Sequence, residues 1–229
     1  MQGTMPFRWD DDYGARLGVM ARDGSSTTVR WFDVEPCYVF HPMNSFERQG
    51  RNGTEIVIDV ARFRSLWRKG SEEFDNVGLL HRWVLDLTTG TAKEEQLDDR
   101  PGEFPRVADD VIGLANRYGY LAATRPGNGE SLFATELFKF DLVNGSKTTH
   151  DCGPGRRPGE GVFAPDTSAG STRAEDDGWV LTYVHDAASD TSELVILDAT
   201  DIAAPPVARV LIGRRIPFGF HGSWVPTSG

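Results

Sequence analysis

Two of the five histidines in this 229-residue chain lie among aromatic residues, in positions suited to bind a metal ion. His41 ends an apolar run and precedes Pro42, which cannot continue a β-ladder, so its imidazole is expected where a strand breaks off. His221 has glycines two residues before it and one residue after it, which let the backbone approach another group closely. One such histidine is more often a core or turn residue, but the pair suggests ligands.

Two glutamates in apolar surroundings, Glu103 and Glu160, are candidates for the same site. Two histidines with one carboxylate form the ligand set of a non-haem iron site that keeps open positions for oxygen. Alternatively, each glutamate accepts the Nδ1–H of a ligating imidazole and fixes its tautomer. A third interpretation pairs Glu103 with Arg100 or Arg106. The residues alone leave all three open.

Several other kinds of chemistry lack sequence support. The chain contains no GxSxG, no phosphate-binding Gly-Lys-Ser/Thr loop, no GxGxxG before a helix and no HExxH. A net charge of −10 repels phosphate backbones, which disfavours nucleic-acid binding. The acidic runs 10–12 and 175–177 lack the ligand spacing of an EF-hand, so they are expected in solvated loops.

The elements that position these residues are predicted to be strands. With 25 glycines and 13 prolines, the chain is rich in turn formers. Apolar runs bounded by turn residues predict short strands, and one segment, 60–69, predicts a helix because Val60, Phe63 and Trp67 fall near helical spacing. The predicted strands are 28–34, 37–41, 55–60, 79–87, 118–124, 136–142, 179–185, 193–198 and 207–212.

A hairpin pattern recurs along the chain. Apolar runs end at Asp86 and at Asp141, each followed by leucine and then by glycine at the fourth position after the aspartate, and a weaker copy ends at Asp198. Recurrence at about 55 residues in an all-β sequence indicates propeller blades of four strands each, about four blades in this length. The alternative is that Asp-Leu-x-x-Gly is only a common β-turn signature.

The two cysteines, Cys37 and Cys152, do not form a disulfide framework, which favours a reducing, cytoplasmic setting. No apolar run approaches the roughly 20 residues of a membrane span, and the first residues do not resemble a signal peptide.

Motifs in a constant order resemble one known family over nearly the whole chain. They include Gly-Glu-Phe-Pro-Arg at 102–106 and Pro-Phe-Gly-Phe-His-Gly at 217–222, and the others are 7–9, 18–20, 30–47, 80–83, 117–120, 159–165, 175–179 and 197–199. Together they resemble the carotenoid cleavage oxygenases. That family is a seven-bladed β-propeller with Fe(II) on its axis, held by four histidines, three of which are oriented by glutamates.

The resemblance assigns roles to the candidate residues. His41 matches the third iron ligand and His221 the fourth, while Glu103 and Glu160 match two of the glutamates that orient ligands. It therefore favours glutamates that hold imidazoles over a glutamate that binds the metal.

The family's other two ligands and one glutamate lie in its amino-terminal half, and no histidine precedes His41. The resemblance thus implies that residues 1–229 are the carboxy-terminal portion of an all-β propeller, with the amino-terminal blades absent. It also implies that His81, His150 and His185 are not ligands.

The implied activity is oxidative cleavage of a conjugated carbon–carbon double bond in a carotenoid, apocarotenoid or stilbene by O2, which gives two carbonyl products. Because carotenoids reside in membranes, a peripheral membrane contact is compatible with this activity. Candidates for an apolar substrate tunnel are Phe40, Phe104, Phe218, Phe220 and Trp224.

Two rival interpretations are a non-catalytic propeller module that binds a partner and a truncated product of an enzyme gene. An open set of blades leaves unpaired sheet edges, so the chain by itself is expected to self-associate. It is also expected to bind iron weakly and to show no turnover, because half of the coordination shell is absent.

Overall fold

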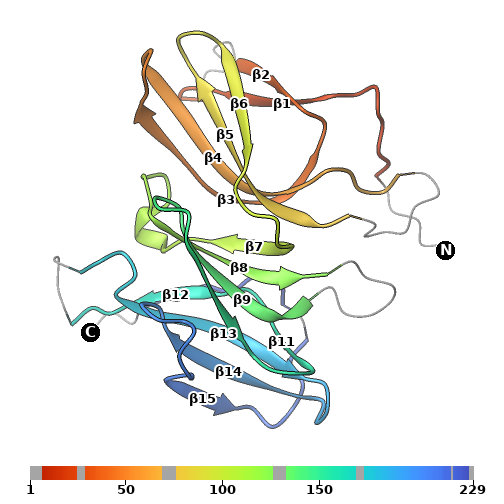
Figure 1. Cartoon of the computed structure of the whole chain (residues 1–229), viewed down its shortest axis with the longest axis vertical. Helices are drawn as coiled ribbons and strands as arrows, with labels where there is room; N and C mark the ends of the chain where they lie inside the picture. The colour runs from red at the N-terminus through yellow and green to blue at the C-terminus, as the bar shows by residue number, and fades with distance from the viewer. Residues whose placement is uncertain are drawn as a thin grey trace.

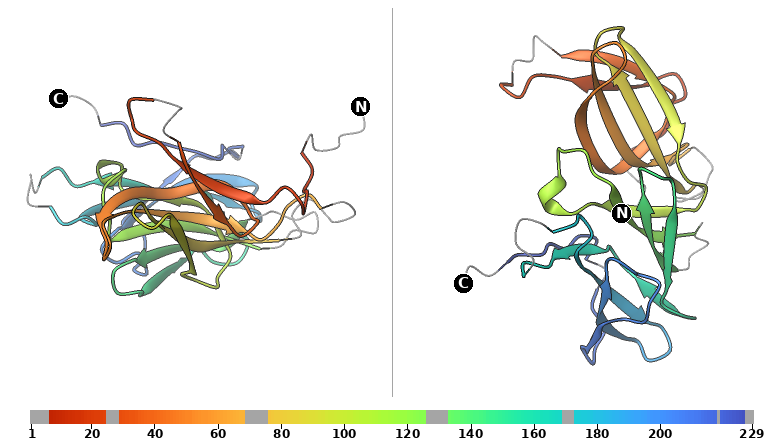
Figure 2. Two further views of the ribbon diagram at one scale, coloured as in Figure 1. Left: turned by 90° about the horizontal axis from the view of Figure 1, so that it is seen from above. Right: turned by 60° about the vertical axis from the view of Figure 1, so that its left-hand side comes forward.

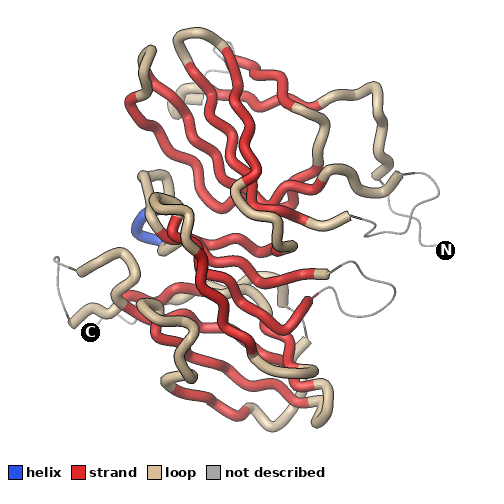
Figure 3. The backbone as a smooth tube through the Cα atoms, in the orientation of Figure 1, coloured by secondary structure: helices blue, strands red, loops and turns tan. Residues whose placement is uncertain are grey.

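The protein is almost wholly strand and loop (Figure 3). The computed structural model describes residues 7–24, 29–68, 76–125, 133–168, 173–217 and 219–226. Within these ranges the only helical element is a short 3-10 turn, η2 (Asp109–Val111), and no helix is long and apolar enough to cross a membrane. The predicted all-β class is confirmed.

The strands form a two-stranded hairpin and three larger antiparallel sheets, which follow one another along the molecule in sequence order (Figures 1 and 2). The hairpin pairs β1 (Ala15–Val19) with β2 (Arg30–Val34). The first sheet contains β3 (Tyr38–Gln49), β4 (Thr54–Phe63), β5 (Gly78–Asp86) and β6 (Thr91–Gln96). The second sheet contains β7 (Gly102–Arg106), β8 (Tyr118–Thr124), β9 (Phe133–Asp141) and β10 (Lys147–Asp151). In the third sheet β11 (Arg156–Pro158) and β12 (Val162–Pro165) both pair with β13 (Gly178–Asp186), which is followed by β14 (Thr191–Asp198) and β15 (Ala208–Leu211).

Apolar side chains from neighbouring sheets form the core. Leu137 of the second sheet packs in one cluster with Val180 and Leu197 of the third, and each is at most 1% exposed. Met43 of the first sheet packs with Leu121 of the second. Because each sheet buries its face against the next, the sheets stack as successive blades do. About four blades of four strands each were predicted; the described residues form three sheets of four or five strands and one two-stranded hairpin.

The helix predicted over 60–69 is wrong. β4 continues through Phe63, and Val60 pairs on one side with Pro42 of β3 and on the other with His81 of β5. Two ladders and a run of β-branched residues outweigh a three-residue apolar spacing. Beyond the strand, Trp67 has φ of 55°, which a right-handed helix does not allow.

The recurrent hairpin turns are built on aspartates. Asp86 accepts the backbone N–H groups of two residues that follow it, and Asp141 does the same. The third copy is at Asp186 and not at Asp198: Asp186 caps its turn in the same way, and Asp190 with φ of 48° occupies the place where the other two turns have a left-handed glycine.

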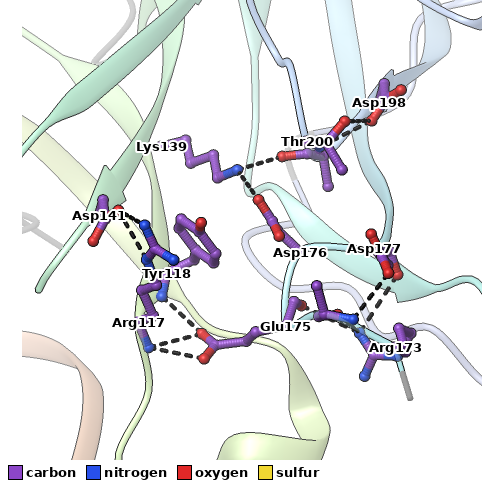
Figure 4. A network of polar contacts seen from close by, with 12 residues as sticks. Arg117, Tyr118, Lys139, Asp141, Arg173, Glu175, Asp176, Asp177, Asp198 and Thr200 are labelled. Atoms are coloured by element: carbon purple, nitrogen blue, oxygen red, sulfur yellow. Dashed lines mark hydrogen bonds and ion pairs between the residues drawn. The ribbon is translucent and has the colours of Figure 1, made fainter. Parts of the chain in front are cut away.

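The acidic run 175–177 is not a solvated loop, contrary to expectation, but joins the second and third sheets (Figure 4). Glu175 accepts the backbone N–H groups of Arg117 and Tyr118 at 2.9 and 2.7 Å. Asp176 accepts a hydrogen bond of 2.6 Å from Lys139, which is 7% exposed and also donates to the carbonyl of Ala199. The run 10–12 is exposed, as expected.

Asp176→Ala is expected to destabilise the protein by about 3 kcal/mol, because it leaves the Lys139 ammonium buried without its carboxylate. Urea denaturation measures this loss of unfolding free energy. The matched control is Asp99→Ala, which removes a carboxylate that is 85% exposed and 3.7 Å from Lys147 and should cost at most about 1 kcal/mol. Equal losses in the two variants would contradict the assigned role of Asp176.

Candidate metal centre

The first strands of the three larger sheets bring the candidate residues together. His41 lies in β3 and Glu103 in β7, two edge strands that contact each other. Glu160 lies between β11 and β12, at the same edge of the third sheet. His221 comes from the segment 219–226, which forms no strand. Residues that are distant in sequence thus meet at one side of the stacked sheets.

Proline residues shape the backbone at two of these positions. β3 has register shifts on both sides of Pro42, next to His41, and β7 has one between Glu103 and Arg106, a stretch that contains Pro105. Proline cannot donate to a ladder, and bulges redirect side chains, so both edge strands turn polar groups toward the site.

The carboxylate of Glu103 holds the His41 ring. Nδ1–H of His41 donates to Oε2 of Glu103 at 2.7 Å, and the backbone N–H of Phe104 donates to the same oxygen. Glu103 is 2% exposed, and its Oε1 has no hydrogen-bond partner among the described residues. The hydrogen bond to Glu103 raises the pKa of His41 and outweighs burial, which acts in the opposite direction.

A second pair joins His221 to Glu160. Nδ1–H of His221 donates to Oε1 of Glu160 at 3.2 Å, and the N–H of Gly222 donates to Oε2 at 2.7 Å. Arg106 donates to Oε1 of the same carboxylate at 3.3 Å. The Glu160 side chain is 4% exposed whereas that of His221 is 53% exposed. One carboxylate therefore anchors both a ring and the backbone beside it.

The two imidazoles lie next to each other. Their ring centroids are 4.7 Å apart at an interplanar angle of 75°, and the Phe104 ring lies 5.1 Å from His41 and 5.6 Å from His221. Each ring uses Nδ1 for its glutamate, which leaves Nε2 available. The separation is short enough for both to reach one ion through bonds of about 2 Å.

These donors are of the type that iron accepts: imidazoles whose second nitrogen is held by a carboxylate. The described residues contain no group of three or more His, Cys, Asp or Glu side chains arranged to hold a metal. His41 and His221 thus fit a metal ion as two of its ligands, and further ligands would come from outside these residues.

Glu103 does not form the ion pair considered from its sequence neighbours. Arg100 pairs with Asp98, and Arg106 reaches Glu160. Each glutamate contacts the Nδ1 atom of its own histidine and does not contact the other histidine. Carboxylates that orient a ligating imidazole are arranged in this way.

The other three histidines, His81, His150 and His185, lie in separate environments. Nδ1–H of His150 donates to the carbonyl of Ile202 at 2.8 Å, and His185 lies 3.0 Å from Asp190. Burial lowers the pKa of His81, which favours its neutral form. These contacts give His150 and His185 structural roles, whereas Nε2 of His81 lies 3.6 Å from Oε2 of Glu94 and has no hydrogen-bond partner among the described residues.

The aromatic residues predicted to line a substrate tunnel differ in their surroundings. Phe40 packs into an aromatic cluster with Tyr38, Phe63 and Trp67, although its ring also stacks beside His41 at 6.1 Å. Phe104 is 4% exposed with φ of 55°, a strained backbone for a bulky residue.

Phe220 and Trp224 line a pocket of about 350 Å³ beside His221, and Phe218 lies outside the described residues. Phe133, which the sequence did not single out, also lines this pocket and stacks on Phe104 at 5.4 Å. The strand predicted from the sequence began at residue 136, so no sequence signal pointed to Phe133, which is the first residue of β9. From the sequence, Arg106 was considered only as an ion-pair partner of Glu103.

Glu103→Gln is expected to lower the pKa of His41 in the metal-free protein, because the carboxylate that favours the imidazolium is lost. A histidine whose pKa is raised by folding stabilises the folded state at pH values below the ordinary histidine pKa. This stabilisation is lost as the pH rises through the raised pKa. The Gln variant should therefore be destabilised more at pH 5.5 than at pH 8.

NMR titration of the imidazole nitrogens measures the pKa of His41. The matched control is Glu160→Gln, which should lower this pKa less, since Glu160 acts on His41 only through its charge. An unchanged pKa of His41 in Glu103→Gln would show that the hydrogen bond does not control this ring.

Comparisons with known proteins show which family this chain matches. Residues 1–226 match the family model described as retinal pigment epithelial membrane protein. The chain is 40% identical over 238 residues to a carotenoid cleavage oxygenase of Mycobacterium tuberculosis, covering 100% of this chain and 46% of that protein. It is 33% identical over 224 residues to the apocarotenoid-15,15'-oxygenase of Synechocystis, covering 94% of this chain and 44% of that protein.

The fold is similar to that of a crystal structure of cobalt-substituted Synechocystis apocarotenoid oxygenase, with a TM-score of 0.82 and 31% identity. The alignment covers 96% of this chain and 46% of the other. The chain spans about half the length of the relatives it matches. From the family match, the level of identity and the fold together, this chain belongs to the family of retinal pigment epithelial membrane protein and the carotenoid cleavage oxygenases.

Proposed function

We propose that this chain is the carboxy-terminal part of an Fe(II)-dependent dioxygenase that cleaves a conjugated double bond of a carotenoid or apocarotenoid. The reaction adds the two atoms of O2 across one carbon–carbon double bond and gives two carbonyl products. Two of the relatives carry names that state cleavage of carotenoids or oxygenation of apocarotenoids.

The observation that carries the proposal is the pair of imidazoles 4.7 Å apart, each with a buried carboxylate on Nδ1. His41 and His221 would hold the metal through Nε2. Glu103 and Glu160 keep the proton on Nδ1, so that the lone pair of Nε2 faces the ion. Neutral ligands leave the ion its full charge; when bound, it supplies the site at which O2 reacts.

The surrounding apolar groups suit a polyene. Phe104 lies against both rings, while Phe133, Phe220 and Trp224 line the pocket beside His221. These side chains would bind the substrate by apolar contact and exclude water. A stilbene would make the same apolar contacts, so the experiment must distinguish the two substrate classes.

The test uses the protein in the longest form its gene encodes, loaded with Fe(II) without oxygen and then exposed to O2 with an apocarotenal or a stilbene. We expect aldehyde products with the wild type. His41→Ala and His221→Ala should lose bound iron and turnover, since each removes a ligand. Iron content by metal analysis and products by chromatography are measured.

His185→Gln serves as the control, because His185 also pairs with a carboxylate and lines the same pocket. It should keep its iron. Iron retained in both alanine variants would refute the ligand assignment. Binding of a polyene without iron and without oxygen-dependent products would favour the non-catalytic binding module.

Glu103→Gln should weaken iron binding by about 10–100-fold, the usual effect of removing a group that orients a ligand. The affinity is measured by competition with a chelator. Glu175→Gln is a control with a carboxylate that caps backbone groups away from the rings, and it should keep the wild-type affinity. Equal iron affinity in both variants would show that Glu103 has only a structural role.

A further inference from the structure

Arg106 contacts both the carboxylate of Glu160 and the segment that carries His221. Its Nη1 donates to Oε1 of Glu160 at 3.3 Å and to the carbonyl of Gly222 at 3.1 Å. Its Nη2 donates to Asp109 at 3.0 Å. A guanidinium presents its donors in a rigid planar fork, so these partners are held in one arrangement.

The segment 219–226 depends on these contacts. It forms no strand, and the His221 side chain is 53% exposed, so packing alone does not hold the ring. In the described structure its hydrogen bonds to the rest of the chain are three: His221 Nδ1–H and Gly222 N–H to Glu160, and Arg106 to the Gly222 carbonyl. Every one of them involves Glu160 or Arg106.

One strand serves both histidines. Glu103 and Arg106 lie three residues apart on β7, where regular alternation would direct them to opposite faces. The register shift between them, with Phe104 in the left-handed region, changes that alternation. As a result Glu103 holds His41 while Arg106 holds the partner of His221.

Arg106 also offsets the cost of burying a charge. The Glu160 carboxylate is 4% exposed, and a buried carboxylate is tolerated when it is paired and fully hydrogen-bonded. A lysine at this position would supply the positive charge but not two donors at fixed angles.

We propose that Arg106 is a positioning residue that clamps the Glu160 carboxylate to the Gly222 carbonyl and thereby sets the His221 ring against the His41 ring. It acts through Glu160 and the Gly222 carbonyl and not as a ligand. The proposal deepens the proposed function, on which its metal-binding readout rests.

The first test is independent of metal. Hydrogen exchange of the Gly222 amide, measured by NMR in the metal-free protein, should be about tenfold faster in Arg106→Met than in the wild type, because the clamp on its acceptor is gone. Arg106→Lys should fall between the two. The matched control is Asp109→Asn, which alters the other partner of the Arg106 guanidinium. In this variant the Gly222 amide should exchange at the wild-type rate.

The second test measures affinity for Co(II) and Fe(II). Arg106→Met should weaken binding by about tenfold, with partial recovery in Arg106→Lys. In a Glu160→Gln background the Met substitution should weaken binding less than it does in the wild type, because only the contact with the Gly222 carbonyl remains to be lost. Thermal unfolding identifies variants with a global loss of structure, and Arg106→Gln replaces the Met variant if the latter does not fold.

The outcomes separate the two proposals. Unchanged Gly222 exchange in a folded Arg106→Met protein overturns the positioning role, whatever the metal affinity. Faster exchange in a protein whose wild type binds no metal supports the positioning role and refutes the proposed function. Additive effects of the Arg106 and Glu160 substitutions would show that Arg106 acts independently of Glu160 and would also overturn the inference.

Discussion

The two buried carboxylates, Glu103 and Glu160, are the constraint on which the rest of the structure depends. A carboxylate with almost no exposed surface must find hydrogen-bond donors inside the protein. Glu103 accepts the backbone N–H of the next residue, Phe104, and an imidazole 62 residues away. Glu160 accepts an imidazole 61 residues away together with the backbone N–H of Gly222 beside it. Two hydrogen bonds to imidazoles thereby require the three larger sheets and the carboxy-terminal segment to keep fixed positions.

Apolar burial brings the sheets together, and polar contacts select their relative position. The side chains between neighbouring sheets contribute a non-directional attraction. Directional contacts then restrict sliding: Lys139 of the second sheet donates to Asp176, and Glu175 accepts the first backbone N–H of β8, that of Tyr118 (Figure 4). These contacts lie away from His41 and His221, yet they join the second and third sheets, to which Glu103 and Glu160 belong.

The backbone near the rings is irregular where function requires it. Bulges next to Pro42 and Pro105 interrupt the edge strands, and Phe104 occupies the left-handed region while buried against both imidazoles. Such a conformation costs of the order of 1 kcal/mol or more and persists because its surroundings determine it. Hydrogen bonding at Glu103 and ring packing around Phe104 supply that restraint.

The sequence by itself determined the all-β class, the apolar strands, and which histidines and glutamates deserved notice, because burial and turn formation are recorded in local patterns. Short polar edge strands such as β6 and β10 carry no such pattern and were missed. Only the tertiary structure decided that 60–63 is strand, through pairing on both sides. It also decided that Arg106 serves Glu160 and a carbonyl 116 residues away, because charge pairing depends on distance in space and leaves no trace in residue spacing.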